Sequence, residues 1–324
     1  MSNKYSVKLY RGYGHQHNMV AYGHAFEWMA TSKKDIYESS LANMVHLLKL
    51  FMVRPFPYAR LRLHFDSQMV ETVAEKDGFF KFQWSSSQAF AGGMYPLFVE
   101  LLGEGDKVLA TDRSDILIPE ITQMAFISDI DDTVLVSHST TILKRMRELL
   151  AKNPYKRRLF SSAAIWYQLL ASGGVKDQPS NPFFYVSSSE WNLYDNIMKI
   201  FEHNMLPSGV LLLSHLKRFR EVFNTGRTKH ESKKDRIARI MRVFPHQKFV
   251  LIGDNSQRDP MIYSAIVEEF PGRVFAIFIR NVRKRKGKST QLLMDQLTDM
   301  GVQTYLFEHN IDAIFHSREI GLIQ

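Results

Sequence analysis

Apolar and polar positions alternate through the first third of the chain, and this two-residue period is typical of β-strands with one buried face. Asp77-Gly78 adds a turn signal directly ahead of an aromatic run. One stretch, 39–52, has apolar residues at helical spacing instead. The pattern predicts a β-rich N-terminal domain over residues 1–120, with strands at 6–10, 19–26, 60–65, 69–73, 79–84 and 96–102.

From about residue 121 the pattern changes to apolar strand-like runs that alternate with longer helical segments. This alternation is typical of a parallel sheet covered by helices. Pro207, Pro245 and Pro271 each follow a predicted helix and precede a strand, where proline would end the helix. We therefore predict an α/β domain of Rossmann-like architecture over residues 121–324. Its expected strands are 124–127, 183–186, 209–213, 248–252 and 274–279, and its expected helices are 141–151, 165–171, 191–203, 234–243 and 291–300.

The composition narrows the class of protein. The chain of 324 residues contains 0 cysteines, which excludes disulfides, cysteine nucleophiles and cysteine metal sites and favours a reducing compartment. The first twelve residues lack the apolar core of a signal peptide. No apolar run reaches the length that a bilayer span needs. We expect a cytoplasmic protein.

The formal net charge of +9 favours an anionic partner, and nucleic acid, anionic lipid and phosphorylated metabolites all fit that sign. The run 283–288 follows a predicted strand end. It could attract an anionic substrate or lipid surface, or it could be a solvated loop; nucleic acid is the less expected partner. The basic residues cluster at 144–147, 156–158, 217–220 and 280–288.

Polar side chains follow three of the predicted parallel strands. Because the carboxyl ends of such strands meet at one edge of the sheet, these side chains should gather there. Two lysines also begin a predicted helix just before the third of these strands. The residues concerned are Asp129, Asp131, Ser187, Asp254 and Asp259, with Lys233 and Lys234 at the helix start.

These residue types suit the hydrolysis of a phosphate monoester. A phosphate dianion repels a carboxylate nucleophile, so the site needs a cation, and Mg²⁺ prefers oxygen ligands such as Asp129 and Asp254. Asp129 could attack phosphorus and split the hydrolysis into two easier steps. Asp131, two residues on, could protonate the leaving alkoxide and later deprotonate water. Ser187 and a lysine could stabilise the phosphoryl oxygens.

Four ordered motifs in the chain resemble those of the haloacid dehalogenase (HAD) superfamily. They are DxDxT from Asp129 to Thr133, a serine at a strand end, a lysine before a helix and GDxxxxD. The superfamily's spacing from this lysine to an apolar residue of the helix favours Lys233, four residues before Ile237, over Lys234. The resemblance implies a Mg²⁺-dependent HAD fold. It implies Asp129 and Asp131 as catalytic residues, Thr133, Ser187 and Lys233 as phosphate-binding residues, and Asp129, Asp131, Asp254 and Asp259 as metal ligands.

Three longer stretches, SDIDDT, FFYVSSSEWNLYDN and KFVLIGDNSQRDPMIY, are similar to the catalytic domain of the App1-type phosphatidate phosphatases. The similarity covers about residues 120–324. It implies conversion of phosphatidate to diacylglycerol through an aspartyl-phosphate intermediate. It also implies an anionic lipid as substrate. With such a substrate, the basic patches would make peripheral contact with membranes.

Relatives in this superfamily place a cap between the first and second motifs, here residues 133–183. Asn153-Pro154 and Gly173-Gly174 break this segment into short pieces, so we expect a small cap and an open site. Two other functions remain open. One is a phosphatase of the same chemistry acting on a soluble metabolite or a phosphoprotein. The other is a catalytically silent membrane-binding module, which the intact set of charged groups disfavours.

Overall fold

The computed structural model describes residues 5–29, 49–120, 123–130, 161–173, 180–214 and 232–324. Several predicted features lie outside these residues: most of the helix at 39–52, the helix at 141–151, three basic clusters, Asp131 and Thr133. The described residues form two compact units, one up to Glu120 and the other from residue 123 onwards. None of the helices in the described ranges combines the length and the apolarity that crossing a bilayer requires.

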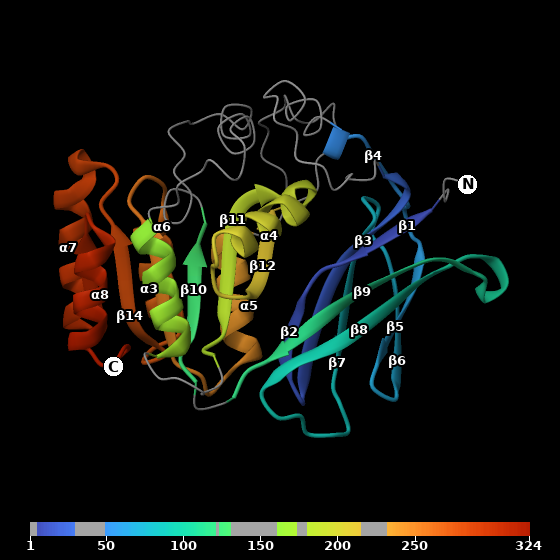
Figure 1. Ribbon diagram of the computed structural model, residues 1–324, viewed down its shortest axis with the longest axis horizontal. Coiled ribbons are helices and arrows are strands. Elements are labelled where there is room, and N and C mark those ends of the chain that lie inside the picture. The colour runs from blue at the N-terminus through green and yellow to red at the C-terminus, as the bar shows by residue number, and fades with distance from the viewer. Residues whose placement is uncertain (1–4, 30–48, 121–122, 131–160, 174–179, 215–231) are drawn as a thin grey trace. The chain divides into compact units, whose positions relative to one another are not determined.

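The N-terminal unit is built on one nine-stranded sheet (Figure 1). The path through the sheet is β1-β3-β2-β9-β8-β5-β6, and β4 and β7 also pair with the long strand β3. All six predicted strands are present, and three further strands, β2, β4 and β9, were not predicted. The strands are β1 (Ser6–Leu9), β2 (Gly12–His15), β3 (Asn18–Met29), β4 (Val53–Pro55), β5 (Arg60–Phe65), β6 (Gln68–Val73), β7 (Phe79–Trp84), β8 (Gly93–Leu102) and β9 (Val108–Ile118).

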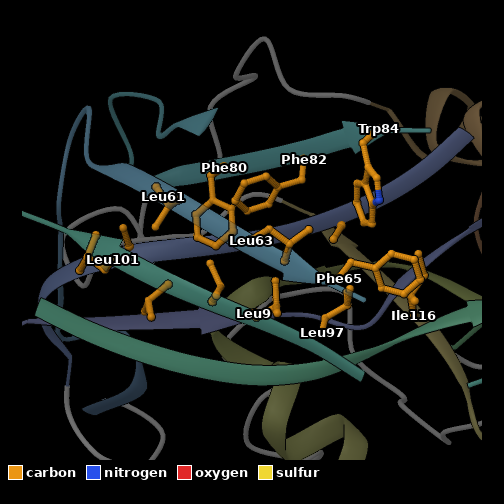
Figure 2. Close-up of a cluster of buried hydrophobic side chains, with 14 of the residues drawn as sticks. Leu9, Leu61, Leu63, Phe65, Phe80, Phe82, Trp84, Leu97, Leu101 and Ile116 are labelled. Atoms are coloured by element: carbon orange, nitrogen blue, oxygen red, sulfur yellow. The ribbon is translucent and has the colours of Figure 1, made fainter. Parts of the chain in front are cut away.

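Alternate residues of these strands form the core of the N-terminal unit, shown in Figure 2. β5 and β7 each bury every second side chain, as a strand with one solvated face should. Phe65 and Trp84 meet edge to face with ring centroids 5.8 Å apart, and Phe80 and Phe82 pack alongside each other at 5.5 Å. Burying each such side chain contributes about 1.5–3 kcal/mol.

The predicted turn at Asp77-Gly78 precedes β7. The carboxylate of Asp77 accepts a hydrogen bond from the backbone N–H of Phe79 at 3.1 Å. Gly78 has φ +80°, and a Cβ atom there would lie 2.4 Å from the backbone oxygen of Ala25. Glycine is therefore required both by the left-handed backbone and by the neighbouring strand.

A histidine is buried in the same unit. His24 on β3 is 1% exposed, its Nδ1 lies 3.0 Å from the hydroxyl of Tyr10, and its ring stacks on Phe26. Burial lowers the pKa of His24 to about 4, although the carboxylate of Asp77 acts in the opposite direction. The imidazole is therefore neutral in the folded protein well below neutral pH.

This burial predicts acid sensitivity. In the unfolded chain His24 takes up a proton near pH 6.5, whereas in the folded protein it stays neutral down to about pH 4. The free energy of unfolding is therefore unaffected by His24 above pH 6.5 and decreases as the pH falls from 6.5 towards 4. The loss should reach roughly 2 kcal/mol by pH 4.5. Melting curves of the whole chain between pH 7 and 4.5 should show a smaller acid-induced drop in His24→Gln than in wild type. His17→Gln, at an exposed position of the same unit, should keep the wild-type drop; equal drops in all three proteins would contradict the prediction.

The second unit contains a six-stranded sheet in which every described pairing is parallel. Its order is β12-β11-β10-β13-β14-β15 (Figure 1). The predicted parallel α/β architecture and its five predicted strands are thus confirmed, and β15 is an additional edge strand. The strands are β10 (Ala125–Asp129), β11 (Phe183–Glu190), β12 (Gly209–Ser214), β13 (Phe249–Asp254), β14 (Val274–Arg280) and β15 (Gln303–Phe307).

Helices cover both faces of this sheet, as alternate residues of β11 indicate. Phe183 contacts Tyr167 of α3 and Tyr185 contacts Phe201 of α4, whereas the intervening Phe184 contacts Phe244 at the end of α5. Successive side chains of a strand point to opposite faces, so α3 and α4 lie opposite α5. The helices are α3 (Ser161–Ser172), α4 (Tyr194–His203), α5 (Lys233–Val243), α6 (Asp259–Glu269), α7 (Gly287–Asp299) and α8 (Asn310–Glu319).

Helix α3 falls within the segment 133–183 that the sequence analysis assigns to a small cap. Its Trp166 is fully buried against Phe278 of β14 and Phe307 of β15, at 5.2 and 5.4 Å between ring centroids. The indole N–H of Trp166 also donates to Ser317 of α8 at 3.0 Å. This part of the segment is therefore a layer of the sheet's own core, and the rest of the segment up to 179 lies outside the described residues.

Candidate active site

Asp129 and Asp254 are the last residues of two neighbouring strands, β10 and β13. The chain leaves β10 for β11 and β12 on one side and returns to β13 on the other. Such a reversal of strand order opens a crevice at the carboxyl edge of a parallel sheet, where α/β proteins bind ligands. The two carboxylates therefore stand at the topological switch point of the sheet.

A third carboxylate and one ammonium group complete a buried charged cluster. Asp129, Asp254 and Asp259 each offer one carboxylate oxygen, and these oxygens all lie within 4.8 Å of one another. Nζ of Lys233 lies 2.8 Å from Oδ1 of Asp129 and 2.5 Å from Oδ1 of Asp259. Burial alone would lower the pKa of Lys233, but the two neighbouring carboxylates outweigh it and raise that pKa above its ordinary value. The lysine is thus charged.

The start of α5 determines which lysine reaches the cluster. Ser232 caps the helix by accepting from the N–H of Asp235 at 3.2 Å, and the Asp235 carboxylate accepts from the N–H of Ser232 at 3.0 Å. This capping box fixes Lys233 as the first helical residue. Lys234 turns away and pairs with Glu269 at 2.8 Å, with 39% of its side chain exposed. The structure therefore places Lys233 in the cluster and Lys234 outside it.

Close approach of α6 to β13 brings Asp259 beside the strand. A Cβ atom on Gly253 would lie 2.7 Å from Oδ2 of Asp259 and 2.8 Å from the hydroxyl of Tyr263, so only glycine leaves room for both groups. Oδ2 of Asp259 accepts from the backbone N–H of Asp254 at 3.3 Å. In the Gly253-Asp254 pair, the glycine therefore leaves room for Asp259 and Tyr263, and Asp254 supplies a carboxylate to the cluster.

Of the other predicted site residues, Ser187 is described by the structure, whereas Asp131 and Thr133 are not. Ser187 is buried, and the pairing of Asp129 with Val186 puts it one residue beyond the neighbour of Asp129. β11 does not end before Ser187, as the sequence suggested, but continues to Glu190 with a shift in register. Asp131 and Thr133 lie outside the described residues, so their roles remain predictions. The structure brings together Asp129, Lys233, Asp254 and Asp259.

Sequence reasoning missed the polar groups that support this edge of the sheet. Ser128 and Tyr167 share a hydrogen bond of 2.7 Å on the α3 face, and burial raises the pKa of this tyrosine hydroxyl. On the α6 face the hydroxyl of Tyr263 donates to the backbone oxygen of Ile252 at 2.8 Å. Tyr167 comes from a largely apolar segment, and no sequence signal marked it as a neighbour of the cluster. Tyr263 ends the KFVLIGDNSQRDPMIY stretch and stands four residues after Asp259, so its place beside the cluster did have a sequence signal.

The cluster fits a small, hard divalent cation. Its donors are all carboxylate oxygens, the type of ligand that Mg²⁺ prefers. The three carboxylates lie close together in a buried place, where a divalent cation would offset the repulsion between them. Asp129 and Asp254 are suited to ligate the cation, and Asp259 is held by Lys233 and the backbone of Asp254.

The fold and the site define a class of α/β protein with a carboxylate centre at the switch point of a parallel sheet. Residues 124–281 match the family described as phosphatidate phosphatase APP1, catalytic domain. The matched segment contains the whole described acidic cluster.

Two curated proteins resemble the chain at moderate identity. An uncharacterised protein of Schizosaccharomyces pombe is 26% identical over 178 residues, which cover 55% of this chain and 28% of that protein. Phosphatidate phosphatase APP1 of Saccharomyces cerevisiae is 27% identical over 179 residues, which cover 55% of this chain and 29% of that protein. The chain thus matches less than a third of the length of these relatives.

Among solved structures, a carbohydrate acetylesterase from Xanthomonas citri superposes with a TM-score of 0.33 and 10% identity over 95% of this chain and 72% of its own. A similarity of that size carries no argument about fold or function.

Proposed function

We propose that the α/β unit is a Mg²⁺-dependent phosphomonoester hydrolase of the HAD type, with Asp129 as nucleophile and phosphatidate as its leading substrate. The observation that carries the proposal is the meeting of Asp129, Asp254 and Asp259 beside the charged Lys233 at the switch point of the sheet. The family of residues 124–281 and the name of the budding yeast relative support a phosphatase that acts on phosphatidate.

Bound Mg²⁺ would supply the positive charge that lets a phosphate dianion approach carboxylates. Asp129 and Asp254 would hold it, with Asp131 as a further ligand. Lys233 adds a fixed ammonium charge 2.8 Å from Asp129, which lowers the repulsion further and orients the nucleophile. Ser187 and Thr133 are proposed as hydrogen-bond donors to the phosphoryl oxygens.

The reaction would proceed in two displacements at phosphorus. A carboxylate oxygen of Asp129 forms a bond to phosphorus while the bond to the ester oxygen breaks, and Asp131 gives its proton to the leaving alkoxide. Asp131 then accepts a proton from water as that water attacks phosphorus. The bond between phosphorus and Asp129 breaks, inorganic phosphate leaves, and both carboxyl groups return to their starting state.

The proposed setting is the cytoplasm, with peripheral contact at membranes. The net charge of +9 and the basic residues after β14 support an anionic lipid substrate. The β-rich unit would position the enzyme on membranes or on partners.

A panel of substrates tests the proposal. Phosphate release should be measured from phosphatidate in mixed micelles, a soluble sugar phosphate, p-nitrophenyl phosphate and a phosphopeptide, each with Mg²⁺ and with EDTA. We expect release only with Mg²⁺, and a kcat/KM for phosphatidate at least about tenfold above the soluble esters. Preference for a soluble ester would show that phosphatidate is not the substrate, but the proposed hydrolysis of a phosphomonoester would stand. Vesicle binding without release from any monoester would favour the silent membrane-binding module.

A further inference from the structure

The four residues 255–258 join Asp254 to Asp259, so their backbone sets how these two carboxylates stand to each other. The loop also touches one of them directly, because the backbone N–H of Ser256 donates to Oδ1 of Asp254. A displacement of this loop would therefore rotate the Asp254 carboxylate and change its distance from Asp259.

The first residue of the loop is attached to the segment that follows β14. Asn255 is 1% exposed, and its Nδ2 donates to Oδ1 of Asn281 at 2.7 Å and to the backbone oxygen of Arg283 at 3.2 Å. Its Oδ1 accepts from the backbone N–H of Arg283 at 2.8 Å, and its own N–H donates to the backbone oxygen of Arg280 at 3.1 Å. Asn255 therefore uses both ends of its amide to fasten the loop.

A lysine from the basic run holds the middle of the same loop. Nζ of Lys286 donates to the backbone oxygens of Ser256 at 3.1 Å and Gln257 at 3.3 Å. Lys284, two residues earlier, has 80% of its side chain exposed and lies 3.2 Å from Glu308 on the surface. The basic run is thus divided between a lysine that supports the loop and neighbours that face solvent.

We propose that Asn255 and Lys286 are positioning residues for the acidic cluster: they hold the loop 255–258 so that the Asp254 carboxylate keeps the orientation needed to ligate a divalent cation, with Asp259 at a fixed distance from it. This inference rests on the proposed function, since it assigns the support of that same site. Supporting residues of metal ligands commonly change metal affinity by about 10–100-fold when they are altered.

The sign of the effect separates positioning from simple electrostatics. Lys286 is a cation near a cation site, so removing its charge should by electrostatics alone leave Mg²⁺ affinity unchanged or make it tighter. If Lys286 positions the loop, its removal should weaken Mg²⁺ binding. The two explanations therefore predict opposite shifts.

The test measures Mg²⁺ and Mn²⁺ binding by calorimetry on the full chain, together with the Mg²⁺ concentration that half-saturates hydrolysis of p-nitrophenyl phosphate. Lys286→Met should weaken cation binding about tenfold, and Lys286→Arg, which can still donate to both carbonyl oxygens, should restore most of it. Lys284→Met is the matched control and should bind the cation as tightly as wild type or more tightly. Asn255→Asp, which loses the amide donor, should weaken binding at least as much as Lys286→Met.

Each outcome decides the inference. Unchanged or tighter binding in both Lys286→Met and Asn255→Asp would overturn it while leaving the proposed function intact. Equal weakening in Lys284→Met would also overturn it, since the effect would then not depend on the loop. Absence of cation binding in the wild-type chain would overturn both this inference and the proposed function. Thermal melting of each variant checks that weaker binding is not loss of fold.

Discussion

Asp129→Asn is expected to lower phosphate release at saturating Mg²⁺ by at least about a thousandfold, because the amide that replaces the carboxylate is a poor nucleophile. The change keeps the size of a side chain that is 1% exposed, and an amide oxygen can still accept from Lys233. The variant should therefore stay folded, with a small decrease in melting temperature, although it loses nearly all activity. Loss of turnover with a retained fold is the expected result.

Release of inorganic phosphate and the far-ultraviolet circular dichroism of the same samples measure the two halves of this prediction. Asp295→Asn is a suitable control, because it makes the same chemical change at an exposed position of α7, where the carboxylate accepts a hydrogen bond from Gln291. That variant should keep wild-type turnover. If Asp129→Asn hydrolyses phosphate esters at the wild-type rate with Mg²⁺ present, Asp129 is not the nucleophile.

The central strands of the α/β unit were predictable because they are buried on both faces. β13 buries all six of its residues, and such strands appear in a sequence as uninterrupted apolar runs. β15 was missed because it is a short edge strand whose residues are mostly half-buried, which leaves a mixed pattern. β9 was missed for a related reason: charged side chains such as Asp112 and Arg113 interrupt its apolar positions, and its pairing with β8 along most of its length is a long-range property.

Helices were predictable where one face alone is apolar. α5 and α4 have that pattern, and both were found within a few residues of their true bounds. α6 and α8 were not predicted, because their apolar residues are spread around the helix rather than gathered on one side. α6 also carries Pro260 in its first turn, a position where proline is tolerated but where a proline in sequence suggests a break.

The candidate site likewise has residues that the sequence predicts and residues that it does not. Carboxylates at strand ends can be inferred from sequence, because a parallel sheet gathers its carboxyl ends at one edge. The choice between Lys233 and Lys234 had a local signal as well, since Ser232 and Asp235 have the spacing of a capping box and mark the helix start. Asn255 and Lys286 had no such signal. Their contacts join segments about thirty residues apart, and only the fold brings those segments together.

Lys233→Met is expected both to destabilise the protein and to reduce turnover. The substitution keeps a long side chain but removes the charge that lies between Asp129 and Asp259, leaving buried carboxylates without their ammonium partner. Breaking a buried ion pair in this way costs roughly 3–5 kcal/mol. Because a divalent cation would bind the remaining carboxylates in the folded state only, added Mg²⁺ should raise the melting temperature of Lys233→Met.

Turnover should fall by at least about a hundredfold even at saturating Mg²⁺, since a fixed positive charge beside the transferring phosphoryl group is lost. Melting curves with and without Mg²⁺, and phosphate release from p-nitrophenyl phosphate, measure the two effects. Lys234→Met is the matched control: it removes the adjacent, partly exposed lysine that pairs with Glu269, and such surface pairs contribute at most about 1 kcal/mol. Equal effects of the two substitutions on stability and turnover would show that the buried ammonium group has no special role, because only Lys233→Met removes the lysine that contacts the acidic cluster.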